Sequence, residues 1–388
     1  MRLNILRYHN PFYYFCFKYL RMFYRKLLYF LLLIPGLVFS QLSLKQQLIS
    51  ADLNLGYNVA RVETNYLFEE KMPYSFQINW QKANYFDEKK LGQFGYSDLG
   101  FTFLYHDFRD DELGKNYSLY AFMEYYLIKP VHRLQLSFRL SQGLAYNTNP
   151  YDKIRNPKNK LFGSHWLFPF DLALNLKIPK LYKNWGLQAG LAIFHYSNGN
   201  LQSPNYGANI PSLTLGINYD SRSGKVIRDK IFPGYDKNFR YLIFSRFGFT
   251  ESDNYDSGIF PFFIPGFQVE KHLNFRHKII AGAELYLSYF LKELIRYEYY
   301  SIPELNHTEI SDFKRFGFFA EHEFYYKKIG INTGVGYYIY YPYPFESRVY
   351  EKMGVKIYVS NRWTGLVSLK FHYFSRAEAM EFGIMYRL

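Results

Sequence analysis

The sequence has very little cysteine and, after its first forty residues, no long apolar run. Cys16 is the only cysteine, so no intrachain disulfide can form. Beyond Gln41 no segment is long and apolar enough for a transmembrane helix, and no heptad repeat is present. Cys/His metal-ligand spacings, phosphate-binding loops and Pro-rich linkers are missing too. A helical membrane protein, a coiled coil, a zinc module and a P-loop enzyme are therefore excluded.

The N-terminus has the pattern of an export signal. Arg25 and Lys26 precede an apolar run over residues 27–40, and Gln41 follows it. This run suits the core of a signal peptide and is too short to span a bilayer, although a short anchor is an alternative. We predict a signal peptide over residues 1–40, and its removal would leave a mature chain without cysteine.

Aromatic residues are abundant, whereas the overall hydropathy is modest. The chain has 41 Tyr and 39 Phe, yet its mean hydropathy is −0.26. Aromatic side chains favour strands and gather at membrane interfaces. High aromatic content with modest hydropathy fits a transmembrane β-barrel, in which only alternate residues meet lipid.

Period-two alternation between short turns dominates the rest of the chain. In 134–140, apolar residues at even positions alternate with Gln135, Ser137 and Arg139. Strands with one apolar and one polar face fit an outer-membrane barrel, with a secreted β-sandwich as the alternative. We predict an all-β fold: one antiparallel outer-membrane barrel of about 12–16 strands, forming a single domain over 41–388. The candidate strands are 51–62, 73–84, 98–107, 116–129, 133–147, 169–178, 185–197, 210–220, 239–250, 260–272, 276–291, 312–326, 329–341, 348–360, 363–374 and 378–388.

A histidine and a serine stand on the apolar face of one of these strands. In 187–197 the odd positions are apolar up to Ile193, and His195 and Ser197 continue the same parity. Asn209 has the matching parity on the next strand, so it can stand beside His195. We therefore predict a small polar site on the outside of the barrel, near the membrane interface.

These residue types supply the parts of a serine hydrolase. A serine becomes a nucleophile when a histidine takes its proton, and a third group orients that histidine. Asparagine side chains and backbone amides can stabilise an oxyanion. The alternative is purely structural, because a His-x-Ser pair is common by chance and such residues also hydrogen-bond at strand ends.

Residues 195–207 resemble the active-site segment of the outer-membrane lipid A 3-O-deacylases, also known as acyloxyacyl hydrolases. The shared pattern is His195-x-Ser197-Asn198-Gly199 followed by Pro204-Asn205-x-Gly207. The resemblance implies a serine esterase that releases an ester-linked 3-hydroxyacyl chain from lipid A, in the outer membrane of a Gram-negative-type cell. It implies Ser197 as nucleophile, His195 as base, and Asn205 with the backbone of Asn198 and Gly199 as oxyanion donors. It implies no metal or other cofactor.

Two departures from the family pattern leave alternatives open. Asn209 stands where the family has a glutamate, which leaves three alternatives. Asn209 orients His195 in a less active site, another carboxylate takes the place of the glutamate, or activity is lost. The chain is also much longer than the simple family barrel. A non-enzymatic barrel with a degenerate site, acting as a channel or surface-binding protein, is the alternative function. The net charge of +14 suits either a phosphorylated lipopolysaccharide partner or loop solubility, and no nucleic-acid partner is expected.

Overall fold

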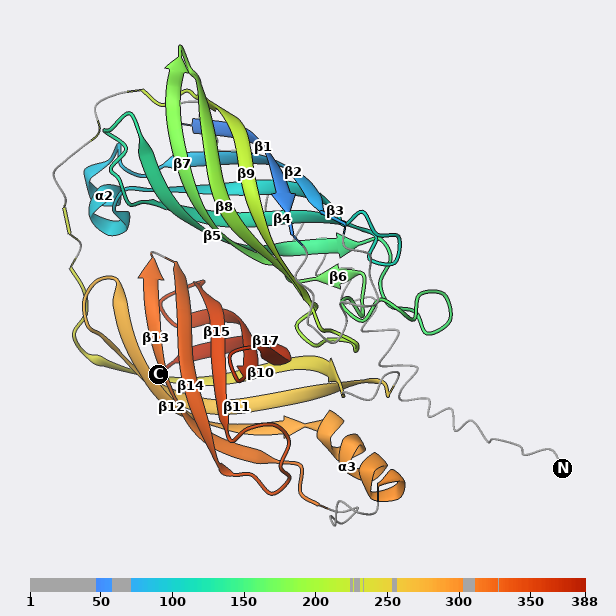
Figure 1. Ribbon diagram of the computed structural model, residues 1–388. Coiled ribbons are helices and arrows are strands. Elements are labelled where there is room, and N and C mark those ends of the chain that lie inside the picture. The colour runs from blue at the N-terminus through green and yellow to red at the C-terminus, as the bar shows by residue number, and fades with distance from the viewer. Residues whose placement is uncertain are drawn as a thin grey trace. The chain divides into compact units, whose positions relative to one another are not determined.

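The computed structural model of the chain describes residues 47–57, 71–223, 226, 231–232, 234–252, 257–302, 311–326 and 328–388. The predicted signal peptide and Cys16 lie outside these residues. The described part consists mainly of antiparallel strands (Figure 1). The strands are β1 (Gln47–Gly56), β2 (Tyr74–Ala83), β3 (Ser97–Asp107), β4 (Lys115–Tyr126), β5 (Gln135–Asn147), β6 (Trp166–Leu167), β7 (Phe170–Tyr182), β8 (Trp185–Tyr196), β9 (Ala208–Asp220), β10 (Phe239–Glu251), β11 (Ile259–His272), β12 (His277–Ser288), β13 (Arg315–Tyr326), β14 (Ile329–Tyr340), β15 (Val349–Tyr358), β16 (Trp363–His372) and β17 (Arg376–Arg387).

The first half of the chain closes into a barrel of its own. Neighbouring strands pair in the order β1 to β5, β7, β8 and β9, and β9 pairs back with β1. The two-residue β6 only extends one edge of β5. Among the described strands, this first barrel therefore has eight members, and the loop between β8 and β9 lies at one of its ends.

The second half closes separately. Strands β10 to β17 pair in sequence order, and β10 pairs with β17. The sequence prediction of an antiparallel outer-membrane barrel is confirmed, but its single ring is corrected to two eight-stranded barrels. The sixteen candidate strands all correspond to observed ones. The prediction of a single ring was wrong because the number of rings depends on which strand pairs with β1. The alternation within each strand does not specify whether that partner is β9 or a later strand.

Burial is inverted relative to a soluble protein. On β8, Leu187, Leu191 and Ile193 are exposed, while Gln188 between them is buried. On β1, Leu53 and its apolar neighbours are likewise exposed, and the polar residues between them are buried. A soluble sandwich would bury the apolar set, so the prediction of lipid-facing apolar and lumen-facing polar side chains is confirmed.

Buried polar side chains fill the interior of the first barrel. Asp52 accepts hydrogen bonds from Asn79 at 2.6 Å and Gln188 at 2.6 Å. Lys177 and Glu124 form an ion pair at 2.6 Å, and both are almost fully buried. Each charge is thus matched inside the lumen, as buried charges must be. Towards the end that carries the β8–β9 loop, an apolar cluster with Phe108, Phe162 and Tyr196 continues the filling.

Ion pairs occupy the interior of the second barrel. Arg246 pairs with Glu381 at 2.5 Å, and Lys352 pairs with Glu321 at 2.9 Å. Rings of Tyr286, Tyr338 and Tyr350 pack between these charges. Buried polar and aromatic side chains therefore occupy the described interiors of both barrels.

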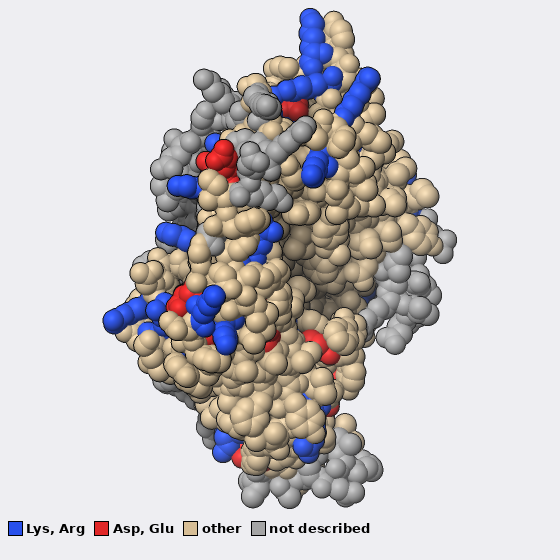
Figure 2. Space-filling model, turned by 90° about the vertical axis from the view of Figure 1, so that its left-hand side faces the viewer, with Lys and Arg blue, Asp and Glu red and all other residues tan. Residues whose placement is uncertain are grey.

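Two helices in the described part were not predicted. α2 (Glu88–Phe94) lies between β2 and β3, and Asp87 caps it by accepting from the N–H of Lys90. α3 (Tyr289–Ser301) begins within the candidate strand 276–291 and continues beyond its end, and it buries Phe290, Leu291, Leu294 and Ile295. No helix in the described part is long and apolar enough to cross a membrane. The space-filling view shows broad areas free of charged side chains (Figure 2).

Candidate active site

His195 lies on the outer face of β8, close to the end of the strand. It shares this face with the exposed Leu191 and Ile193, and its ring stacks on Phe170 of β7 at 4.8 Å between ring centroids. Asn209 of β9 stands directly opposite in the ladder. His195 is therefore placed towards lipid rather than towards the lumen, as its parity with the leucines indicated.

Asn209 fixes the orientation of the His195 ring. Nδ1 of His195 and Oδ1 of Asn209 are 2.7 Å apart. An amide oxygen can only accept, so Nδ1 donates its proton to Asn209. Nε2 then keeps its lone pair and is the nitrogen available to take a proton.

Ser197 follows β8 immediately and is largely buried, with 8% of its surface exposed. Its carbonyl accepts the N–H of Phe168 at 2.7 Å, which holds the end of the strand against the preceding loop. In the described part of the chain, no hydrogen bond joins its hydroxyl to His195. Catalytic contacts are often long in a ligand-free enzyme and tighten only when substrate binds.

Gly207 lies close to both His195 and Ser197. A Cβ atom built on Gly207 would lie 3.5 Å from Cε1 of His195 and 3.5 Å from Cβ of Ser197. The same atom would lie only 2.9 Å from the carbonyl oxygen of Tyr196. Gly207 also has φ of +69°, which an L side chain rarely adopts. The two candidate catalytic residues therefore converge on a space that only glycine leaves open.

The asparagine-rich loop is held together by side-chain bonds to its own backbone. The backbone N–H of Asn198 donates to Oδ1 of Asn205 at 2.8 Å, and Nδ2 of Asn198 donates to the carbonyl of Gln202. Asn198 is therefore already engaged, unlike its expected role as an oxyanion donor. Because Oδ1 of Asn205 is used, its Nδ2 group points elsewhere and can donate to a ligand. Gly199 sits in the same turn with φ of +64°.

A layer of buried rings supports the site from inside the barrel. Tyr196 lies between the two candidate residues in sequence and points inward, fully buried. Its hydroxyl meets Nδ1 of His106 at 3.2 Å, and His106 in turn stacks on Phe108 at 4.9 Å. The sequence pattern gave His106 no role in the site.

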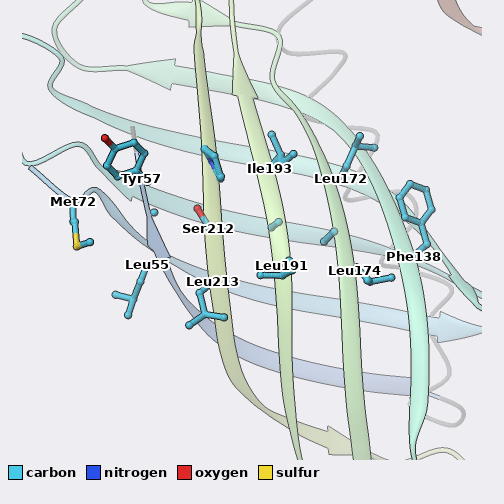
Figure 3. A pocket seen from close by; sticks show the side chains of 14 residues that line it. Leu55, Tyr57, Met72, Phe138, Leu172, Leu174, Leu191, Ile193, Ser212 and Leu213 are labelled. Atoms are coloured by element: carbon cyan, nitrogen blue, oxygen red, sulfur yellow. The ribbon is translucent and has the colours of Figure 1, made fainter. Parts of the chain in front are cut away.

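An apolar groove of about 590 Å³ lies on the outer wall of the first barrel (Figure 3). Ile193 and Pro211, which line it, are each two residues from His195 and Asn209 along their strands. Leu191 and Leu213 form the next cross-strand row. The other lining residues are Leu55, Gly56, Tyr57, Met72, Phe138, Leu172, Ala173, Leu174, Ala192 and Ser212.

Four carboxylates that could have taken the place of the acid, Asp171, Glu321, Glu323 and Glu381, lie away from His195. Asp171 points into the lumen and pairs with Arg139 at 3.3 Å. Glu321, Glu323 and Glu381 are buried inside the second barrel. Among the described residues, Asn209 is the side chain that hydrogen-bonds His195.

Comparison with known families assigns both halves of the chain. A family described as "Lipid A 3-O-deacylase (PagL)" matches residues 71–218, and one described as "Acyloxyacyl hydrolase, C-terminal domain" matches residues 239–388. These two matches follow the division into two barrels. No curated protein matches the chain.

Several solved outer-membrane proteins are distantly similar. The outer membrane enzyme PagL is 18% identical over 43% of this chain and 97% of its own, with a TM-score of 0.31. Neisserial surface protein A is 11% identical over 45% and 97%, with a TM-score of 0.29. A porin from Rhodopseudomonas blastica is 7% identical over 88% and 99%, with a TM-score of 0.16.

Proposed function

We propose that this chain, which belongs to the lipid A 3-O-deacylase family, is a serine esterase that removes an ester-linked 3-hydroxyacyl chain from lipid A. The family places the chain in the outer membrane and makes it a lipid A deacylase. The bond that is cleaved and the serine mechanism are the proposal. The main support for the proposal is the outward-facing His195–Asn209 pair. It lies two residues from Ile193 and Pro211, which line the apolar groove.

The geometry supports a double-displacement reaction at Ser197. Nε2 of His195 takes the hydroxyl proton while the serine oxygen attacks the ester carbonyl. The bond to the glucosamine oxygen then breaks, and His195 returns the proton to that leaving oxygen. A water molecule, activated by the same nitrogen, hydrolyses the acyl-serine and frees the fatty acid and the serine.

Asn209 and Asn205 have different roles in this scheme. Asn209 accepts the Nδ1 proton of His195, so it fixes the tautomer and the ring plane. Nδ2 of Asn205 donates to the oxyanion of the tetrahedral intermediate, with the N–H of Gly199 as a second donor. The Asn198 N–H orients Asn205 rather than binding the oxyanion itself.

The position of the site suits a substrate that is part of the membrane. The acyl chain of lipid A can lie in the groove formed by Ile193, Leu191 and Leu213 while its ester stands at Ser197. An amphiphile in the leaflet then reaches the site without leaving the bilayer. The basic net charge favours the phosphorylated headgroup.

The alternative of a channel finds no support in the described interiors of the barrels. Buried ion pairs such as Lys177–Glu124 and Arg246–Glu381 occupy the lumens where a water path would run. The alternative of a degenerate site rests on Asn209 standing where the family has a glutamate.

Mass spectrometry of lipid A from cells that express the chain tests the proposal. Wild type should remove one 3-hydroxyacyl mass, and Ser197→Ala and His195→Ala should leave lipid A intact. Ser164→Ala is the matched control, because Ser164 lies in an exposed loop and bonds only the carbonyl of Trp166. Unchanged lipid A with folded wild type, or full activity in Ser197→Ala, would refute the proposal.

A further inference from the structure

A short sequence pattern occurs at the same place in both barrels. The seventh strand of the first barrel, β8, begins with Trp185 and ends with Phe-His-Tyr at 194–196. The seventh strand of the second barrel, β16, begins with Trp363 and ends in Phe-His, with Tyr373 next. The same residues thus open and close the same strand of each ring.

The tryptophans also have the same neighbours. Trp185 pairs with Tyr219 on the following strand, with ring centroids 5.2 Å apart and planes at 71°. Trp363 pairs with Tyr386 on its following strand, at 4.8 Å and 60°. Both tryptophans are about half exposed on the outer face. This shared arrangement anchors the two strands in the same way at one end.

The spacing within the pattern differs by a single residue. Phe194 follows Trp185 by nine positions, whereas Phe371 follows Trp363 by eight. Because successive strand residues point to opposite faces, one residue fewer turns everything beyond it to the other face. His195 therefore faces outward, whereas His372 is fully buried inside the second barrel.

Inside the barrel, both ring nitrogens of His372 are engaged by acceptors. Nδ1 lies 3.0 Å from the carbonyl oxygen of Val349, and Nε2 lies 2.7 Å from a carboxylate oxygen of Glu378. Glu378 also receives Arg315 and Lys370, each at 2.5 Å. Both ring nitrogens of His372 are therefore occupied by contacts within the barrel.

The loop that would complete a second site is also missing from this position. Tyr373 and Phe374 both have φ of 56°, and the N–H of Ser375 returns to the carbonyl of His372 at 3.1 Å. This is a two-residue hairpin turn. In the first barrel, residues 197–207 instead form the asparagine-rich loop that holds Ser197 and Asn205.

We infer that the two barrels are tandem copies of one unit and that His372 is the structural counterpart of His195. In the second barrel the histidine completes a buried cluster of charges with Glu378, Arg315 and Lys370. The described part of the chain then has one hydrolytic site, and this last statement alone rests on the proposed function.

Single-cysteine labelling tests the reversal of faces without reference to activity. With Cys16→Ser as background, the chain has no other cysteine. His195→Cys and Phe371→Cys should react with a small membrane-permeant maleimide in the folded protein. Phe194→Cys and His372→Cys should react only after unfolding, and the mass increase of the protein measures each reaction. Labelling of His372→Cys as fast as His195→Cys would overturn the inference.

A second pair of variants tests the same strand register in case His372→Cys does not fold. Ser368→Cys is a conservative change on the buried face of β16, and Val367→Cys lies on its exposed face. Val367→Cys should label and Ser368→Cys should not, and the reverse result would contradict the strand register.

Lipid A analysis tests the single site. Ser375→Ala and His372→Gln should keep deacylation, whereas Ser197→Ala should lose all of it. Residual activity in Ser197→Ala that disappears on adding His372→Gln would overturn the single-site inference. Inactive wild type with the expected labelling pattern would instead refute the proposed function and leave the reversal of His372 standing.

Discussion

Replacing Asn209 by aspartate should raise the maximal rate of hydrolysis. The two side chains have nearly the same shape, so a carboxylate oxygen takes the place of the amide oxygen 2.7 Å from Nδ1 of His195. The hydrogen bond then becomes charge-assisted when His195 takes up a proton. Such bonds contribute about 1–1.5 kcal/mol more than neutral ones, which corresponds to roughly tenfold in kcat.

The same change should shift the pH profile. A histidine acts as base only when neutral, so activity falls as the pH drops through its pKa, ordinarily about 6.5. A neighbouring carboxylate favours the imidazolium and raises that pKa. The acid limb of Asn209→Asp should therefore lie at higher pH than that of wild type, and the rate advantage of Asn209→Asp should vanish at low pH.

Single-turnover hydrolysis of detergent-dispersed lipid A between pH 5 and 9 measures both effects. Asn209→Leu is the matched control, because it keeps similar bulk and removes the acceptor. It should lose at least tenfold in kcat, since the ring is no longer held in one tautomer. If folded Asn209→Asp is more than tenfold slower than wild type at high pH, Asn209 does not accept the Nδ1 proton and the mechanism is wrong.

Three further changes probe the support of the site and the groove. Gly207→Ala should lower stability by about 1–2 kcal/mol because of its positive φ, and it should also lower kcat; a normal kcat would separate Gly207 from the site. Leu191→Trp should fill the groove and reduce kcat/KM several-fold, whereas Leu187→Trp, outside the groove on the same face, should not; equal effects would argue against acyl binding there. Glu124→Gln should cost about 3–5 kcal/mol by leaving Lys177 unpaired inside the barrel, measured by urea unfolding in micelles, and an unchanged midpoint would contradict the buried pair.

The strands and their faces could be predicted because both depend on local sequence. Alternation assigned Leu187, Ile193 and His195 to one face, and the ladder then placed Asn209 beside His195. The closure into two rings could not be predicted in this way. It depends on whether β1 meets β9 or a more distant strand, and the alternating pattern is the same in either case.

Details of the site beyond parity required the folded backbone. The engagement of the Asn198 N–H by Asn205 depends on how the loop turns back on itself, which residue types alone do not specify. His106 meets Tyr196 across the lumen, from a strand about ninety residues earlier. Helix α3 had a local signal, since Phe290, Leu291, Leu294 and Ile295 follow helical spacing, but the alternation on both sides obscured it.

Strand register decides which of the two histidines faces the outside of its barrel. His195 and His372 share a sequence context and a place in the ring, yet one faces the membrane and the other faces a carboxylate. The outward histidine meets an uncharged amide through Nδ1, and Nε2 lies outside that hydrogen bond. The inward histidine meets the carbonyl oxygen of Val349 and the carboxylate of Glu378, so both of its ring nitrogens are engaged inside the barrel. A one-residue difference in the spacing between Trp and Phe thus places one histidine on the outer face and the other inside its barrel, because it reverses the face of every residue beyond it.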